Sequence, residues 1–305
     1  MKQVISDVPV EKLEQELNKD RLLRKTNNGG NEIYVVNYHN SPNVVMEIGR
    51  LREITFRYAG GGTGKEADID IYDTAKEAYE QLVVWDPERK EILGGYRYIL
   101  GNKAPKDQHG KYAIATRGLF EFSSEFKKDY FPHTIELGRS FVQPIYQSTK
   151  VGRKALFALD NLWDGLGALV VTNPEMKYFF GKVTMYTSFN QKARDLILFF
   201  LNHYFGDEKG LVYPREPLGY HHNTEEIEKY FVKNDFKEDK KILNKLVRDL
   251  GENIPPLINS YMGLSSTMKS FGTAMNYKFG EVEETGILIK IDDIYPEKKE
   301  RHLKY

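Results

Sequence analysis

The chain has 305 residues, of which 40% are hydrophobic, so it is long enough to bury a sizeable core. Lys plus Arg and Asp plus Glu both total 44, a balance that provides no net field to attract nucleic acid or an anionic membrane. The absence of cysteine excludes disulfides, a thiolate nucleophile and a thiolate-bound metal.

The first 25 residues alternate charged and apolar side chains, which predicts a short amphipathic helix rather than a secretory signal. The most apolar run elsewhere, residues 196–201, is far shorter than the roughly 20 residues that cross a bilayer. We therefore expect a cytoplasmic protein. Peripheral contact with the inner face of a membrane is left open.

Apolar periodicity and turn residues predict alternating strands and helices along the chain. The expected elements are strand 33–38, helix 42–58, a hairpin of strands 79–85 and 91–99, strand 134–142, helix 151–171, strand 178–185, helix 190–204, exposed helices within 206–250, a helix after Pro255-Pro256 and strand 285–291. We expect a single domain over 1–305, with a core at about 33–205 and a helical elaboration plus a late strand over 206–305.

The segment AGGGTGKE, residues 59–66, comes close to the phosphate-binding motif G-x-x-x-x-G-K-[ST]. A phosphate loop needs a strand before it and a Ser or Thr hydroxyl for magnesium at its end. Here a predicted helix precedes the loop, Ala59 replaces the first glycine and Glu66 replaces the hydroxyl residue. We interpret the segment as a helix C-cap followed by a flexible surface loop, with a lid over a site as its functional role.

Charged residues inside otherwise apolar strands are the strongest sign of a site. Period-two alternation places Arg139 on the apolar face of strand 134–142, unless a bulge at Gly138 turns it round. Arg97 raises the same problem in strand 91–99. Buried arginines need acidic partners, and the stretch EADIDIYD at 66–73 supplies them. A purely structural ion-pair network would show the same sequence pattern.

The order and spacing of these residues resemble a known family. Arg52 and Phe56, Asp70-x-x-Asp73, Gly94-Gly-Tyr-Arg97 and Glu136-x-x-Arg139 resemble the pattern of acyl-homoserine-lactone synthases. ELGRSFVQPIY, LWDGL and IPPLINSYMGL resemble more closely the ornithine-lipid and glycine-lipid N-acyltransferases, often labelled hemolysin-like. The similarity covers residues 33–295. It implies the α/β fold of GCN5-related N-acetyltransferases (GNAT), a central, mostly antiparallel mixed sheet flanked by helices.

The activity that the resemblance implies is transfer of a (3-hydroxy)acyl chain from acyl carrier protein to the amino group of glycine or ornithine, in amino-acyl lipid synthesis. Glu136 would be the base or would position it, and Arg139 would fix Glu136 or the substrate carboxylate. The acceptor pocket implied in the same way comprises Arg52, Asp70, Asp73, Arg97 and Ser140.

The donor site implied by the resemblance lies at the start of helix 151–171. Lys150, Gly152, Arg153 and Lys154 would hold the phosphopantetheine phosphate and an acidic carrier protein, while a solvated basic turn is the structural alternative. Lys154 stands where the acetyltransferase pattern has a small residue, which favours a carrier-protein thioester over a coenzyme A thioester. The expected partners are acyl carrier protein and an amino acid, with no nucleic acid, no bound cofactor and no metal.

Two other functions stay open. One is an acyl-homoserine-lactone synthase, against which stand the long carboxyl-terminal extension and the absence of a tryptophan shortly after Phe56. The other is a non-catalytic module that binds an acyl chain or carrier protein. Tyr186 and Ser188 are candidates for the acid that protonates the leaving thiol. His221-His222, which precedes Glu225, is interpreted as a helix start rather than a metal site.

Overall fold

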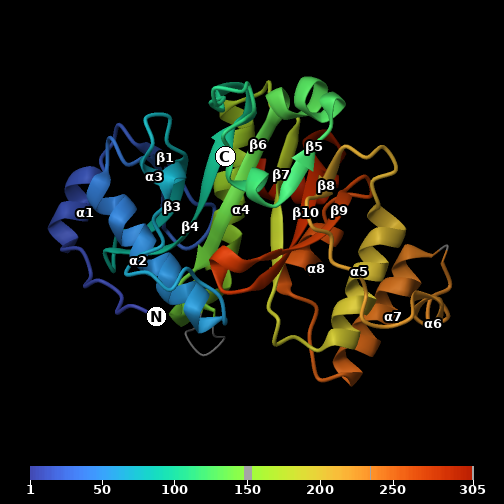
Figure 1. Ribbon diagram of the computed structural model, residues 1–305. Coiled ribbons are helices and arrows are strands. Elements are labelled where there is room, and N and C mark those ends of the chain that lie inside the picture. Colours follow the sequence, from blue (N-terminus) through green and yellow to red (C-terminus); the bar gives the residue numbers. More distant parts are fainter. Residues whose placement is uncertain (148–152, 234, 304–305) are drawn as a thin grey trace.

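The sheet at the centre of the molecule is mixed and mostly antiparallel, as expected. A computed structural model describes residues 1–147, 153–233 and 235–303 (Figure 1). Its largest sheet has eight strands, and among them only β6 and β7 run parallel to each other. In spatial order these strands are β1 (Leu22–Lys25), β2 (Glu32–Val36), β3 (Glu80–Asp86), β4 (Glu91–Leu100), β6 (Thr134–Val142), β7 (Tyr178–Met185), β10 (Val282–Lys290) and β9 (Lys269–Asn276).

Helices cover both faces of this sheet (Figure 1). α2 (Pro42–Tyr58) packs on one face and α4 (Arg153–Thr172) on the other. The remaining α-helices described are α1 (Val10–Glu16), α3 (Ile71–Thr74), α5 (Gln191–Phe205), α6 (Thr224–Glu228), α7 (Phe236–Asp249), α8 (Pro256–Met262) and α9 (Pro296–Leu303). A separate two-stranded sheet joins β5 (Phe120–Phe122) to β8 (Val212–Pro214).

The alternation of side chains along β3 explains the two layers. Leu82 and Val84 belong to the core cluster under α4, whereas Val83 and Trp85 belong to the cluster under α2. Successive residues of a strand point to opposite faces, so a strand covered on both faces is apolar at nearly every position. This double burial explains the continuous apolar run in the sequence.

The predicted strands and helices are largely confirmed, with ends within a few residues of those expected. β1, β5, β8 and β9 were not predicted. The expected amino-terminal helix is shorter than predicted, because α1 ends at Glu16 and β1 follows. The polar segment 206–250 contains β8 besides α6 and α7. The division into a core and an elaboration stays a prediction.

A V-shaped gap opens in the middle of the sheet. β6 and β7 pair with each other only where residues 134–136 face residues 178–180. Beyond these pairs both strands continue, β6 paired on its other side with β4 and β7 with β10. The facing edges of the two strands are therefore not hydrogen-bonded to each other, and the gap between them holds the candidate site.

Candidate active site

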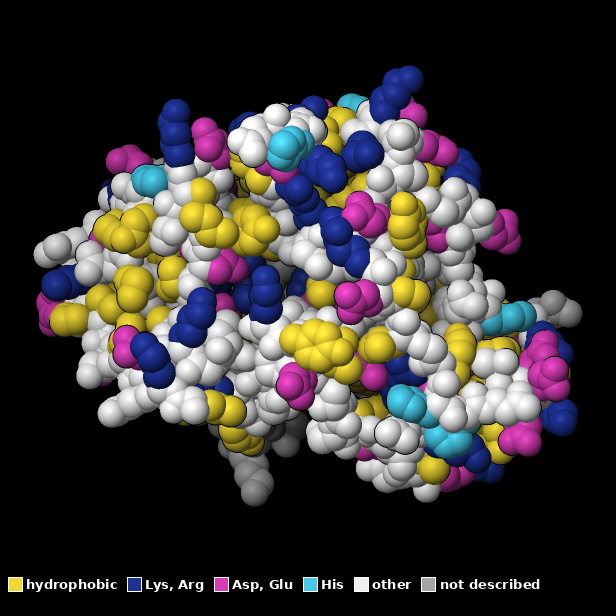
Figure 2. Space-filling model, viewed as in Figure 1, with side chains coloured by type: hydrophobic (Ala, Val, Ile, Leu, Met, Phe, Trp, Pro, Cys, Tyr) yellow, Lys and Arg dark blue, Asp and Glu magenta, His cyan; other side chains and the backbone are white. Residues whose placement is uncertain are grey.

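A cavity of about 1040 Å³ occupies the gap between β6 and β7. This volume is at the upper end of the range for small-molecule sites, roughly 300–1,000 Å³. Phe56 and Asp70 line it on the α2 face, and Leu159 and Leu257 line it on the α4 face. The cavity therefore passes through the sheet. Figure 2 shows basic and acidic side chains gathered around a hollow near the centre of the molecule.

A buried network of arginines and aspartates forms the α2 side of the cavity. Arg52 Nη2 lies 3.0 Å from Asp73 Oδ2, and Arg52 Nε lies 3.4 Å from Asp68 Oδ2. Arg97 Nη1 lies 2.7 Å from Asp70 Oδ1 and 3.1 Å from Asp73 Oδ2. Burial alone would raise the pKa of Asp73, but Arg52 and Arg97 outweigh it and hold that pKa below its usual value. The sequence expectation that the stretch 66–73 supplies acidic partners is confirmed for Asp68, Asp70 and Asp73.

Arg139 joins the network through a β-bulge. Gly138 pairs with Arg97 and Phe141 pairs with Gly95, so two residues of β6 stand opposite one residue of β4. Arg139 adopts a φ of 51°, which turns its side chain to the α2 face, and its Nε lies 2.8 Å from Asp68 Oδ2. The bulge considered as an alternative at Gly138 is therefore present, and it keeps Arg139 off the apolar face of the strand.

Glu136 sits at the point where β6 and β7 diverge, and it is almost completely buried. The Tyr79 hydroxyl donates a hydrogen bond to Oε2, and the Thr116 amide donates one to Oε1 at 3.0 Å. Burial raises the pKa of Glu136, and the hydrogen bonds from Tyr79 and Thr116, together with the more distant charge of Arg97, offset only part of this effect. Arg139 was expected either to fix Glu136 or to bind the substrate carboxylate. The structure does not pair Arg139 with Glu136, so only the second role is kept, as a proposal.

A second buried ion pair lines the β7 and β10 side of the cavity. The Lys182 ammonium donates to a carboxylate oxygen of Glu284, and Asn276 Nδ2 donates to the same oxygen at 2.8 Å. Burial lowers the pKa of Lys182, and Glu284 opposes that change. This pair was not predicted from the sequence. The signal was available, because Lys182 and Glu284 are charges inside apolar strands, as Arg97 is.

The glycine-rich loop holds a carboxylate of the protein itself. Glu53 of α2 accepts hydrogen bonds from the Thr63 amide at 3.0 Å and from the Gly64 amide at 2.7 Å. These amides, which a phosphate would need, are therefore occupied. Glu66 is exposed and lies 3.6 Å from Lys2, so the expectation that it belongs to the acidic supply of the buried arginines was wrong.

The remaining expected site residues fall into three groups. Ser140 and Tyr186 line the cavity, whereas Ser188 is exposed and does not. Lys150 and Gly152 lie outside the described residues, as do the side chains of Arg153 and Lys154.

His222 contacts a buried carboxylate of α5. Its Nδ1 lies 2.9 Å from Asp195 Oδ2. No cluster of three or more potential metal ligands occurs within the described ranges. In the same part of the chain, no helix has the length and apolar character needed to cross a membrane.

Comparison with known proteins agrees with this architecture. The family model described as an acetyltransferase (GNAT) domain matches residues 51–156, which include the second half of α2 and the whole of β3, β4 and β6. An open gap between two parallel strands of a mixed sheet, together with this match, defines a GNAT-type transferase.

Two curated relatives are each 57% identical to this chain over 304 residues. They are glycine N(alpha)-acyltransferases of Phocaeicola vulgatus and Bacteroides thetaiotaomicron, and the alignment covers 100% of this chain and 93% and 90% of theirs. The chain belongs to the same family of N-acyltransferases. Among solved structures, the acyl-homoserine-lactone synthase LasI is similar at 17% identity and a TM-score of 0.33, covering 52% of this chain and 74% of that one, a likeness too distant to support an inference about function.

Proposed function

We propose that the protein transfers an acyl chain from a phosphopantetheine thioester to the amino group of glycine. The observation that carries the proposal is Glu136, a buried carboxylate with a raised pKa at the apex of an open cavity. The two relatives named as glycine N(alpha)-acyltransferases support glycine as the acceptor.

The acceptor arrives as an ammonium ion and must lose a proton before its nitrogen can attack the thioester carbonyl. Glu136 accepts this proton, directly or through water, and its raised pKa makes it a stronger base than an ordinary carboxylate. The N–C bond forms and the C–S bond breaks. The second proton lost by nitrogen goes to the thiolate sulfur, with Tyr186 as the candidate that relays it.

Arg139 is the residue we assign to the glycine carboxylate. Its side chain is 14% exposed, whereas those of Arg52 and Arg97 are 1% and 2% exposed and enclosed by aspartates. Arg52 and Arg97 are therefore assigned to organising the wall of the pocket, with Asp70 and Asp73. Arg139 remains anchored to Asp68 through Nε, while its Nη groups, of which Nη2 lies 3.9 Å from Asp70 Oδ2, would meet the carboxylate.

The donor is proposed to lie along the gap. A pantetheine arm carries amide groups, which can pair with the free backbone edges of β6 and β7 as an added strand does. We retain acyl carrier protein as the preferred donor, with a coenzyme A thioester as the alternative. We place the product, an acylated glycine, in amino-acyl lipid synthesis.

The test offers purified protein a long-chain acyl carrier protein thioester or the matching coenzyme A thioester, with glycine, ornithine or S-adenosylmethionine as acceptor. Thiol release and product mass are measured. We expect N-acylglycine as the main product, with faster release from the carrier protein. Thiol release from Glu136→Gln equal to that of the unchanged protein would overturn the role of Glu136, and a product without glycine would overturn the acceptor assignment.

A further inference from the structure

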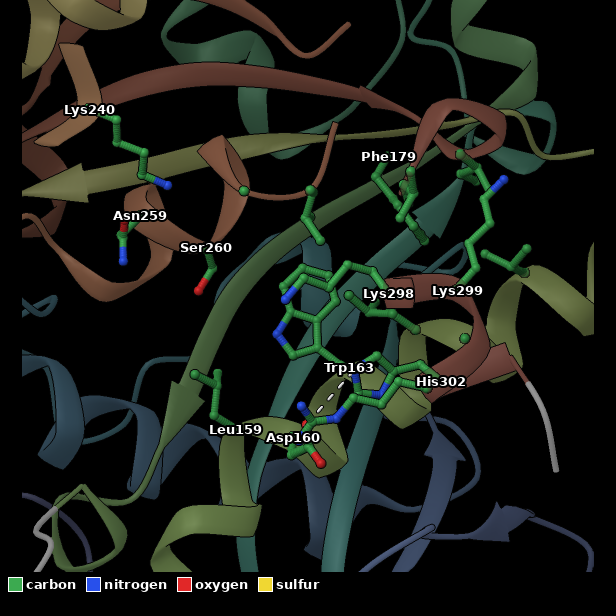
Figure 3. Close-up of a pocket in the computed structure, with 18 residues that line it drawn as sticks. Leu159, Asp160, Trp163, Phe179, Lys240, Asn259, Ser260, Lys298, Lys299 and His302 are labelled. Carbon is green, nitrogen blue, oxygen red and sulfur yellow. Dashed lines mark ion pairs between the residues drawn. The ribbon is translucent and has the colours of Figure 1, made fainter. Parts of the chain in front are cut away.

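A second cavity, of about 470 Å³, lies on the α4 face of the molecule, among α4, α8, α9 and the residue Lys240 of α7. Figure 3 shows Lys240 on one side of it and Lys298, Lys299 and His302 on the other. The apolar part of its lining includes Trp163, Leu166 and Phe179. This cavity shares Leu159 with the larger one, and none of the residues assigned a role in the acyl transfer above lines it.

The charges around this cavity are unbalanced. The carboxylate in its lining, Asp160, lies 2.8 Å from Arg301 and 3.8 Å from His302. Lys299 donates to the backbone carbonyl of Asp292.

Lys240 and Lys298, in contrast, form no ion pair with a carboxylate of the described residues, and the Lys240 ammonium lies 5.9 Å from the centre of the Phe236 ring. Partial burial lowers the pKa of Lys240, and the positive charge of Lys298 lowers it further. The two ammonium groups thus repel each other at the edge of an apolar pocket, and an anion placed between them would relieve that repulsion.

We propose that this cavity binds an amphiphile that carries a single apolar chain and an anionic head group. The chain would pack against Trp163, Leu166 and Phe179, and the head group would lie between Lys240 and Lys298. Apolar burial and charge pairing would both favour such a ligand. The volume lies within the range of small-molecule sites, roughly 300–1,000 Å³. The proposal does not depend on the reaction at Glu136.

The fluorescence of Trp163 can report ligand binding in this cavity, because Trp163 lines this cavity and does not line the larger one. The full chain is titrated with dodecanoate, N-dodecanoylglycine, dodecyl phosphate and, as the neutral match, dodecanol, while tryptophan emission is recorded. We expect the tryptophan emission to change saturably with each anionic probe, and this change to be lost in Trp163→Phe. Dodecanol should bind about tenfold more weakly than the anionic probes. Tighter binding of the carboxylates would identify an acid or acyl amino acid as the ligand, and tighter binding of the phosphate a lipid-phosphate head.

Variants of single lysines test the head-group site. Lys240→Gln and Lys298→Gln should each raise Kd about tenfold. The control is Lys241→Gln, because Lys241 neighbours Lys240 on α7 but pairs with Glu238 at 3.0 Å and lies outside the cavity lining. No saturable Trp163 signal, equal binding of dodecanol, or an unchanged Kd in both lysine variants would overturn the proposal. Thermal unfolding of each variant confirms that it is folded.

Discussion

Glu136 differs from the other buried carboxylates of the larger cavity in its partners. Asp68, Asp73 and Glu284 each face an arginine or a lysine, whereas Glu136 accepts hydrogen bonds from a neutral hydroxyl and a backbone amide. A cationic partner would hold a carboxylate in its ionised form and lower its basicity. This arrangement explains why the site keeps one carboxylate with a raised pKa among several charged neighbours.

The first prediction concerns Glu136→Gln. An amide cannot accept the ammonium proton, so kcat/KM should fall by about 10²- to 10⁴-fold. In the unchanged protein kcat/KM should fall as the pH drops through the pKa of Glu136, which lies above the usual carboxyl value, because the protonated form cannot act as a base. That acid limb should be absent from the variant. Glu66→Gln, which changes an exposed carboxylate, is the matched control.

The second prediction concerns Asp73→Asn. Removing this carboxylate leaves Arg52 and Arg97 without their shared partner in a buried site, which should lower the free energy of unfolding by about 3–5 kcal/mol. The pKa of Asp73 is lower in the folded protein than in the unfolded chain. The ionised carboxylate therefore stabilises the fold above the pKa that Asp73 has in the unfolded chain, and this stabilisation is lost as the pH falls below about 4. Urea unfolding from pH 7 to pH 3 measures both effects. Asp107→Asn breaks the half-exposed pair with Arg117 and should have a much smaller effect.

At the scale of elements, strands covered on both faces could be predicted because their apolar runs are long. β9 escaped prediction because Gly272, at a φ of 83°, interrupts its pattern, and β1 escaped because it has four residues. The bulge at Arg139 could be stated only as an alternative, since it depends on the register with β4. Tyr79 and Thr116 could not be linked to Glu136 from the sequence, because the fold brings together residues 57 and 20 positions apart.

The third prediction concerns the glycine-rich loop, which Glu53 fastens to α2. Glu53→Gln replaces a charged acceptor of two loop amides and should destabilise the protein by about 2 kcal/mol. Amide hydrogen exchange over residues 60–65 should become faster. Glu47→Gln alters another carboxylate of α2, one that pairs with Arg50, and should leave exchange in the loop unchanged. Equal exchange in both variants would show that Glu53 does not hold the loop.

At the scale of the whole molecule, the gap in the sheet connects two unlike environments. The α2 face of the cavity carries the arginines and aspartates, whereas residues such as Leu159 and Leu257 make the α4 face apolar. A polar amino acid and an apolar acyl donor would therefore approach the reacting carbon from opposite faces, with Glu136 at the apex between them. Under the proposed function, the splay of β6 and β7 would give the two substrates separate entries.

The last prediction tests this division with Leu257→Trp. The larger ring would fill the α4 side of the cavity without touching the charged network, so kcat/KM for the acyl donor should fall at least about tenfold while KM for glycine stays within about twofold. Leu257→Met conserves the side-chain volume and should alter neither constant by more than about twofold. Arg139→Lys should have the opposite pattern, with a higher KM for glycine and little change in kcat/KM for the acyl donor. A lysine cannot keep the contact with Asp68 and also offer a planar edge to a carboxylate. An equal rise in KM for both substrates in Leu257→Trp would mean that they share one face, and the two-sided arrangement would then be wrong.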